Sequence, residues 1–84
     1  MSSTVRVILY TKPGCHLCDE MKEEILRAGC SELYALDEID IESNPDLLAR
    51  YRQEIPVLFI GGVEAFRHRL RAEDFKARLS GKES

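Results

Sequence analysis

Apolar and polar positions change their spacing along the chain, and each change predicts an element. Residues 5–10 are nearly all apolar and rich in β-branched side chains, which is typical of a short strand buried on both faces. Pro13-Gly14 marks a turn after this strand. Over residues 16–28, apolar positions recur at helical spacing, and charged residues fill most of the remaining positions. This pattern predicts an amphipathic helix whose buried side carries Leu17, Met21, Ile25 and Ala28.

The middle of the chain predicts a second strand and a second helix. Apolar and acidic residues alternate imperfectly over residues 33–41, as in a half-buried strand. Asn44 and Pro45 follow, and these residues suit the cap and the first position of a helix. The apolar side of this helix would carry Leu47, Leu48 and Tyr51.

The last third of the chain predicts a β-hairpin and a final helix. Two short apolar runs, 57–60 and 63–66, flank Gly61-Gly62. A pair of glycines between two such runs is a signal for a tight hairpin turn. Residues 72–80 then repeat the helical spacing, with Phe75 and Leu79 on the buried side.

These elements predict an α/β fold with the order βαβαββα. The first two strands should run parallel, because a right-handed helical crossover joins them. The hairpin would complete a four-stranded mixed sheet with helices on both faces. The chain has 84 residues, which is the size of one small domain, so we assign residues 1–84 to a single domain.

Composition excludes several classes of function. The net charge of -3 is unlike that of a nucleic-acid-binding domain, which presents a basic surface. The longest uncharged apolar stretch, 56–63, is far shorter than the roughly 20 residues that a membrane span needs. The N-terminus lacks the pattern of a secretory signal. Three cysteines do not form an even-numbered disulfide framework, which favours a reducing, cytoplasmic setting.

Cys15 and Cys18 are the residues best placed for chemistry, because they open the first predicted helix directly after a strand and a Pro-Gly turn. Unpaired amides and the positive end of the helix dipole favour a thiolate at such a position. The thiolate is the attacking species in disulfide exchange. Cys15 is therefore the predicted nucleophile. Cys18, three residues further on, is the predicted resolving thiol.

Two other interpretations of this pair are a metal half-site and two unreactive thiols. A tetrahedral zinc site needs four ligands. Only Cys30, His16 and His68 remain as nitrogen or sulfur ligands, and they form no second pair. The sequence therefore favours redox chemistry over metal binding.

The segment from Tyr10 to Cys18, with Ile55-Pro56-Val57, resembles the glutaredoxins of the thioredoxin-fold superfamily. The order of the elements matches as well, so the similarity covers nearly the whole chain. Within the family, the sequence is most similar to a bacterial glutaredoxin-like group with Gly-Cys-His-Leu-Cys and Ile-Pro-Val. The resemblance implies the thioredoxin (glutaredoxin) fold and thiol–disulfide oxidoreductase activity.

The resemblance also assigns roles around the cysteines. It implies that Pro56 is a cis-proline facing them and that the backbone of Ile55 pairs with an extended substrate segment. Lys12 occupies the position at which many glutaredoxins bind a carboxylate of glutathione. His16 is expected to modulate Cys15. Phe66-Arg67-His68-Arg69 stands near the place where glutaredoxins carry a glutathione-binding Gly-Gly and an acidic residue.

Outside these residues, the sequence predicts ordinary structural roles. We interpret the basic cluster of Arg67, His68, Arg69 and Arg71 as a solvated strand end and Cys30 as a small packed residue.

The function predicted from the sequence is dithiol exchange in cell redox homeostasis, with electron transport through the Cys15–Cys18 disulfide. It needs no metal and no organic cofactor, and glutathione is a candidate reductant or substrate. The expected partner is a disulfide-containing protein or a glutathione mixed disulfide, and we expect a monomer that binds neither nucleic acid nor membrane. The alternative is a redox-inactive thioredoxin-fold partner module, or one that holds a metal ion or an iron–sulfur cluster.

Overall fold

The computed structural model describes residues 4–79 and contains the predicted elements in the predicted order. Short 3-10 turns precede and follow the second strand (η1, Ser31–Leu33; η2, Ile41–Ser43). Ser80, the predicted end of the last helix, lies outside the described residues. The strands and helices are β1 (Val5–Thr11), α1 (His16–Arg27), β2 (Tyr34–Asp40), α2 (Pro45–Tyr51), β3 (Val57–Ile60), β4 (Val63–Arg67) and α3 (Ala72–Leu79).

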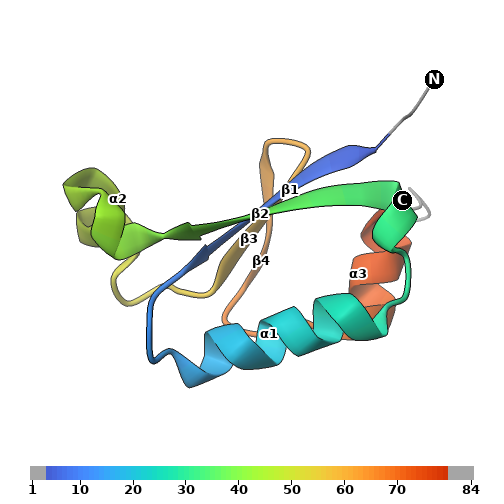
Figure 1. Ribbon diagram of the computed structural model, residues 1–84, viewed down its shortest axis with the longest axis horizontal. Coiled ribbons are helices and arrows are strands. Elements are labelled where there is room, and N and C mark those ends of the chain that lie inside the picture. Colours follow the sequence, from blue (N-terminus) through green and yellow to red (C-terminus); the bar gives the residue numbers. More distant parts are fainter. Residues whose placement is uncertain (1–3, 80–84) are drawn as a thin grey trace.

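The sheet has four strands in the order β2-β1-β3-β4. β1 is parallel to β2 and antiparallel to β3, and β4 is antiparallel to β3. Figure 1 shows β1 and β2 running together through the centre of the molecule. The predicted α/β class and the mixed sheet are therefore confirmed. Both β1 and β2 end at the same edge of the sheet, and the loop from β1 to α1 leaves from that edge.

One face of the sheet carries most of the buried side chains. Helices α1 and α3 lie against this face, below the sheet in Figure 1. We call the buried residues between them the main core. They are Val7, Leu9, Met21, Ile25, Cys30, Tyr34, Leu58, Leu70 and Phe75.

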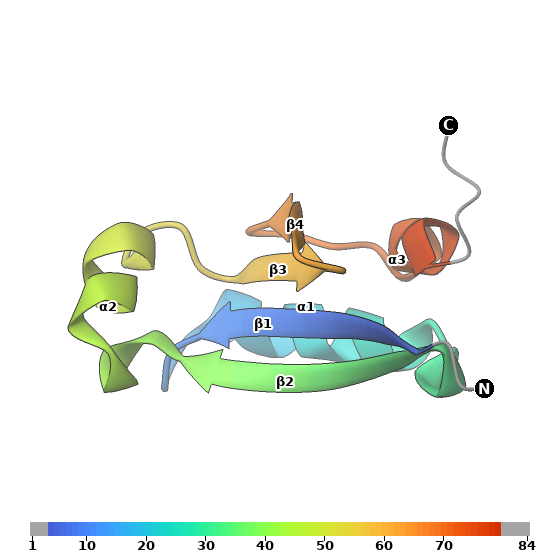
Figure 2. The same ribbon diagram turned by 90° about the horizontal axis from the view of Figure 1, so that it is seen from above.

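Within residues 4–79, the other face is covered only at one end, by α2. Figure 2 shows α2 beyond the ends of β1 and β2 and leaves the rest of this face open. We call the residues packed there the α2 cluster. Its buried members are Ile41, Tyr51 and Val57, and its half-buried members are Tyr10, Leu47, Leu48, Ile55 and Phe59.

The prediction that the first strand is buried on both faces is therefore wrong. Val7 and Leu9 are fully buried against the helices, whereas Ile8 is half-buried and Arg6 is exposed on the other face. The physical reason is the position of α2, which covers the second face at the end of β1 but not along its length. The apolar run in the sequence reflects the central place of β1 in the sheet rather than complete coverage by helices.

Local sequence signals account for the turns that the structure contains. Asn44 caps α2, with its Oδ1 accepting hydrogen bonds from the amides of Asp46 (2.8 Å) and Leu47 (3.3 Å). Gly61 and Gly62 both have positive φ, at 61° and 85°, as a tight hairpin of the favoured primed type requires. The cap and the hairpin are confirmed.

Helix α1 buries a slightly different side from the predicted one. Met21 and Ile25 are buried as expected, but Cys18 joins them, and Leu17 and Ala28 are only half-buried. Glu24, which the helical spacing places outside, instead points to the start of α3. Its Oε1 accepts a hydrogen bond of 2.9 Å from the amide of Ala72. This contact satisfies one of the unpaired amides at the start of a helix.

Candidate active site

Cys15 is the N-cap residue of α1, as the sequence predicts. Its backbone is extended (φ −87°, ψ 109°), and its Sγ accepts a hydrogen bond of 3.2 Å from the amide of Cys18. Gly14 adopts a φ of 79° just before it, which glycine tolerates without strain and which allows the turn after β1. The sulfur of Cys15 therefore lies at the positive end of the helix dipole, within reach of an unpaired amide.

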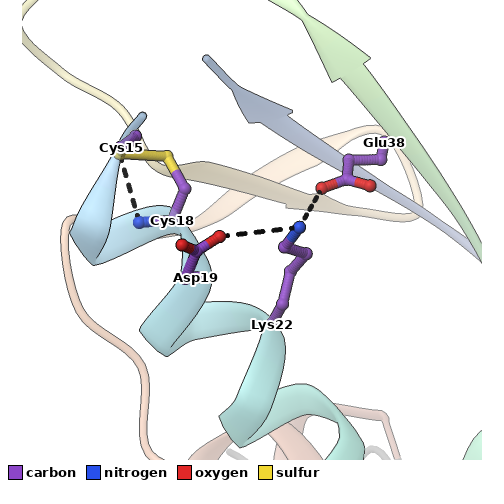
Figure 3. Close-up of a disulfide and its surroundings, with 5 residues drawn as sticks. All are labelled: Cys15, Cys18, Asp19, Lys22 and Glu38. Atoms are coloured by element: carbon purple, nitrogen blue, oxygen red, sulfur yellow. Dashed lines mark hydrogen bonds and ion pairs between the residues drawn. A yellow bond between two sulfur atoms is a disulfide. The ribbon is translucent and has the colours of Figure 1, made fainter. Parts of the chain in front are cut away.

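Cys15 and Cys18 are joined by a disulfide bond, with their Cα atoms 5.3 Å apart (Figure 3). The two residues differ in exposure: Cys15 is half-buried, whereas only 1% of Cys18 is exposed. Only Cys15 is thus open to a molecule approaching from solvent. This asymmetry fits an outer attacking sulfur and an inner resolving sulfur.

A charged network lies one turn further along α1. Lys22 Nζ is 2.8 Å from Glu38 Oε2 of β2 and 3.7 Å from Asp19 Oδ1, as Figure 3 shows. The hydrogen bond to Glu38 is the main reason that the pKa of Lys22 is raised, so this ammonium remains charged at neutral pH. Sequence spacing alone suggests the Asp19–Lys22 pair. Glu38 belongs to a different element, and only the parallel pairing of β1 with β2 brings it near.

Lys12 lies on the β2 side of the cysteine loop. Its carbonyl accepts a hydrogen bond of 3.2 Å from the amide of Cys15. Its half-buried side chain lines an open depression of about 280 Å³. The other lining residues are Thr11, Pro13, Gly14, Asp19, Lys22, Glu38 and Asp40.

His16 is the first residue of α1, and its side chain is 85% exposed. Its Nε2 lies 2.9 Å from Glu20 Oε2, one turn further along the helix. The ring is therefore oriented by a carboxylate on the same helix.

The Ile55–Pro56 peptide bond is cis, and Pro56 is buried. The amide of Ile55 donates a hydrogen bond of 3.2 Å to the carbonyl of Tyr51, the last residue of α2. The carbonyl of Ile55 accepts no backbone hydrogen bond from the part of the chain that the structure describes. Pairing of Ile55 with an extended substrate segment, which the resemblance implies, would therefore use its carbonyl.

The basic cluster at the end of β4 is exposed, in agreement with the predicted solvated strand end, and two of its residues also make specific contacts. Arg67 makes two hydrogen bonds of 2.9 Å to the carboxylate of Glu64 and one of 2.7 Å to Oε1 of Glu54. The amide of His68 donates a bond of 2.7 Å to the carbonyl of Pro56, and His68 has a φ of 71°. The sequence does not reveal the contacts of Arg67 and His68, because they arise where β4 ends beside the Ile55–Pro56 loop.

A groove of about 780 Å³ runs between α1 and residues 68–73. Leu17, which separates the two cysteines together with His16, lines one wall, and His68 lines the other. Charged side chains of both signs line the rest, among them Glu20, Arg27, Arg69 and Glu73. The groove thus begins beside the disulfide and continues toward the start of α3.

The remaining predictions concern Cys30, metal binding and membrane spans. Cys30 is a free, buried cysteine of the main core, in agreement with the packing role predicted for it. Within residues 4–79, no group of three or more His, Cys, Asp or Glu side chains is arranged to hold a metal ion. Over the same residues, no helix has the length and apolar character of a membrane span.

The mixed sheet, the helices around it and the cysteine pair at a helix start define a thioredoxin-fold protein. Known structures show the same fold. A protein of X. campestris, designated XcR50, superposes with a TM-score of 0.76 at 25% identity, over 89% of this chain and 96% of that chain. Chloroplastic thioredoxin z superposes with a TM-score of 0.75 at 19% identity, over 94% of this chain and 78% of that chain.

The family follows from the sequence comparisons. The model of the glutaredoxin-like domain (DUF836) matches residues 6–80, and the chain belongs to this family. A glutaredoxin-like protein of Dictyostelium discoideum, described as a YDR286C homolog, is 30% identical over 73 residues, which cover 80% of this chain and 68% of that protein. The resemblance to glutaredoxin-like proteins is therefore confirmed. Membership of the bacterial group with Gly-Cys-His-Leu-Cys stays a prediction.

Proposed function

We propose that this protein is a thiol–disulfide oxidoreductase that uses the Cys15–Cys18 pair in cell redox homeostasis. The observation that carries the proposal is the placement of Cys15. Its sulfur caps α1 and accepts a hydrogen bond from the amide of Cys18, and Cys15 is the more exposed of the two residues. Cysteines at helix starts have lowered pKa values and react as thiolates near neutral pH.

The reaction has two exchange steps. The Cys15 thiolate attacks one sulfur of the substrate disulfide, forms a mixed disulfide and releases the other sulfur as a thiolate that takes up a proton. The Cys18 thiol then loses its proton and attacks the Cys15 sulfur, which closes the Cys15–Cys18 bond and releases the second substrate thiol. Two electrons pass from the protein to the substrate. An external dithiol, or two molecules of a thiol such as glutathione, returns them.

The residues around the pair suit roles in binding and tuning. We assign the carbonyl of Ile55 and the side of Pro56 to the extended substrate segment. Lys12 would receive a substrate carboxylate from its position beside the cysteine loop, and the charge of His16, set against Glu20, would modulate Cys15. None of these steps needs a metal or an organic cofactor.

The proposed partner is a disulfide-containing protein or a glutathione mixed disulfide, with glutathione or a thioredoxin reductase system as the electron donor. A reducing compartment such as the cytoplasm suits this cycle, because it maintains the dithiol form. We propose a monomer, since one chain supplies both cysteines and the loop that faces the substrate.

Replacing each cysteine by serine tests the proposal. Exchange would be measured with a glutathionylated peptide and with a disulfide-bonded protein, using glutathione plus its reductase or thioredoxin reductase as the donor. Cys15→Ser should reduce exchange to the uncatalysed rate, because the nucleophile is lost. Cys18→Ser should trap a mixed disulfide that mass spectrometry detects. Cys30→Ser is the matched control, since this cysteine lies in the main core outside the pair, and it should remain active.

Two results would reject the assignment. Full exchange by Cys15→Ser would show that another group attacks the substrate. No exchange by the unaltered protein with any of these donors, together with stoichiometric metal or a brown iron–sulfur chromophore after anaerobic purification, would favour the partner-module alternative.

A further inference from the structure

Tyr51 connects helix α2 to the loop that carries Ile55 and Pro56. It is the last residue of α2, and 8% of it is exposed. Its carbonyl accepts hydrogen bonds from two residues of this loop, at 2.8 Å from the amide of Glu54 and at 3.2 Å from the amide of Ile55. The position of the loop therefore depends on where the end of α2 is held.

The ring of Tyr51 holds that end of α2 against the sheet. It stacks on the ring of Tyr10, with the centroids 5.0 Å apart and the planes at 15°. Phe59 packs edge-on to both rings, at 5.6 Å from Tyr10 and 6.5 Å from Tyr51. Aromatic pairs in these arrangements add about 0.5–1.5 kcal/mol to the effect of burial alone. Tyr51 is thus packed against β1 and β3 together.

The partners of this ring lead directly to the two halves of the candidate active site. Tyr10 lies near the end of β1, immediately before the loop that reaches Cys15. Phe59 belongs to β3, which begins directly after Pro56. In Figure 1, α2 and the start of α1 lie at the same end of the sheet, and the chain segment from α2 to β3 starts there. The aromatic contact therefore joins β1, which leads to the cysteine loop, to β3, which follows the Ile55–Pro56 loop.

Two residues at the end of β4 and directly after it also contact the Ile55–Pro56 loop. Arg67 binds Glu54, and the amide of His68 binds the carbonyl of Pro56. These contacts fix the loop toward β4, and the pairing of Val57 with Tyr10 joins β3 to β1 directly after Pro56. The Tyr51 ring adds the support on the α2 side, where the loop begins.

From these contacts we infer that Tyr51 is a positioning residue, which holds the Ile55–Pro56 loop in register with Cys15 through its stack on Tyr10. This inference rests on the proposed function. Loss of the ring lets the end of α2 shift, so the substrate segment binds less well. The helix start that surrounds Cys15 is unaffected, because it is held by α1 and the main core.

A buried tyrosine that only packs would affect stability alone, and Tyr34 provides the matched control. Tyr34 is 9% exposed and packs edge-on against Phe75 at 5.3 Å. It belongs to the main core, whereas Ile55 belongs to the α2 cluster. Tyr51→Leu and Tyr34→Leu therefore remove the same groups at similar burial, but only one of them removes the link to the loop.

The first readout is kinetic, with a glutathionylated peptide as substrate. Tyr51→Leu should raise KM about tenfold, because a small displacement of a binding group has large kinetic effects. Tyr51→Phe should restore the KM, since it keeps the ring. Iodoacetamide should alkylate Cys15 of the reduced protein within about twofold of the unaltered rate, because this small probe does not need the loop. Tyr34→Leu should leave the KM unchanged.

If Tyr51→Leu does not fold, Tyr10→Leu replaces it in the experiment, because Tyr10 is only half-buried and its loss should cost less stability. Tyr10→Leu should also raise the KM, since it removes the other ring of the stack. Equal KM values for Tyr51→Leu, or its substitute, and Tyr34→Leu would overturn the inference.

The second readout is independent of activity, so it distinguishes failure of this inference from failure of the proposed function. Amide hydrogen exchange should show faster exchange of Glu54 and Ile55 in Tyr51→Leu than in Tyr34→Leu under conditions of matched global stability. If the unaltered protein catalyses no exchange but these amides lose protection, the proposed function fails and the positioning by Tyr51 stands. Equal protection in the two variants would overturn the positioning role, whether or not the protein is active.

Discussion

The two faces of the sheet differ in how they are covered and in what they hold. The main core lies under α1 and α3 and contains the largest fully buried side chains, including Phe75, Leu9 and Met21. The α2 cluster is small, lies at one end of the opposite face, and is built mainly from half-buried residues. The main core fixes the helix that carries the cysteines. The α2 cluster fixes the loop that carries Ile55 and Pro56.

The proposed site draws on both faces of the sheet. Cys15 and Cys18 come from α1 on the first face, whereas Ile55 and Pro56 are attached to α2 on the second face. Burial of apolar area is the main source of stability, so the main core should dominate unfolding. The α2 cluster should matter more for substrate geometry than for the fold.

The largest expected effect comes from a matched pair of phenylalanines, one on each face. Phe75→Ala should lower the free energy of unfolding by about 3–5 kcal/mol, because it leaves a cavity in the main core. That is a large share of the 5–15 kcal/mol typical of a domain. Phe59→Ala should cost less, since Phe59 is half-buried in the α2 cluster. Urea unfolding of the oxidised proteins measures both, and the reverse order would refute the division.

Two helix caps offer a finer test, because one lies on each side of the sheet. Asn44→Ala removes the cap of α2, and Glu24→Ala removes the carboxylate at the start of α3. Each should cost about 1 kcal/mol in unfolding free energy. Only Asn44→Ala should also raise the KM for a glutathionylated peptide, because α2 holds the loop. A KM that rises equally in both variants would mean that general loosening, rather than α2, controls substrate binding.

The parts of the structure that follow from local residue patterns could be predicted from the sequence. The Asn44–Pro45 helix start, the Gly61–Gly62 hairpin and the N-cap position of Cys15 each depend on residues within one turn. The alternation of strands and helices then limits the topology to very few arrangements. The mixed sheet and the location of the cysteine pair therefore followed from the pattern alone.

The contacts that could not be predicted join residues far apart in the chain. Glu24 meets Ala72 across 48 positions, and Arg67 meets Glu54 across 13. Their spacing in the sequence carries no signal, because each pairing depends on where helices and strand ends lie in space. Coverage of the second face was overestimated for the same reason, since the apolar run of β1 does not show where α2 will lie.

The smallest effect concerns the charged network that ties α1 to β2 beside the disulfide. The hydrogen bond to Glu38 raises the pKa of Lys22 above its usual value of 10.5, so the charged ammonium is favoured in the folded protein. Its contribution to stability is complete below pH 10.5 and is lost as pH rises through the higher pKa of the folded state. The side chain is 39% exposed, so solvent screening keeps this contribution below about 1 kcal/mol.

Lys22→Gln should therefore lower the unfolding free energy slightly at pH 7, and its difference from the unaltered protein should vanish at strongly alkaline pH. Burial also raises the pKa of Tyr34 above its usual value of 10.0, but its contribution is the same in both proteins and cancels in the comparison. Urea unfolding at pH 7 and at about pH 11 measures how far the difference falls, because at the higher pH the lysine of the unfolded chain has largely lost its proton. A difference that stays the same at both pH values would show that Lys22 acts through packing of its aliphatic stem rather than through its bond to Glu38.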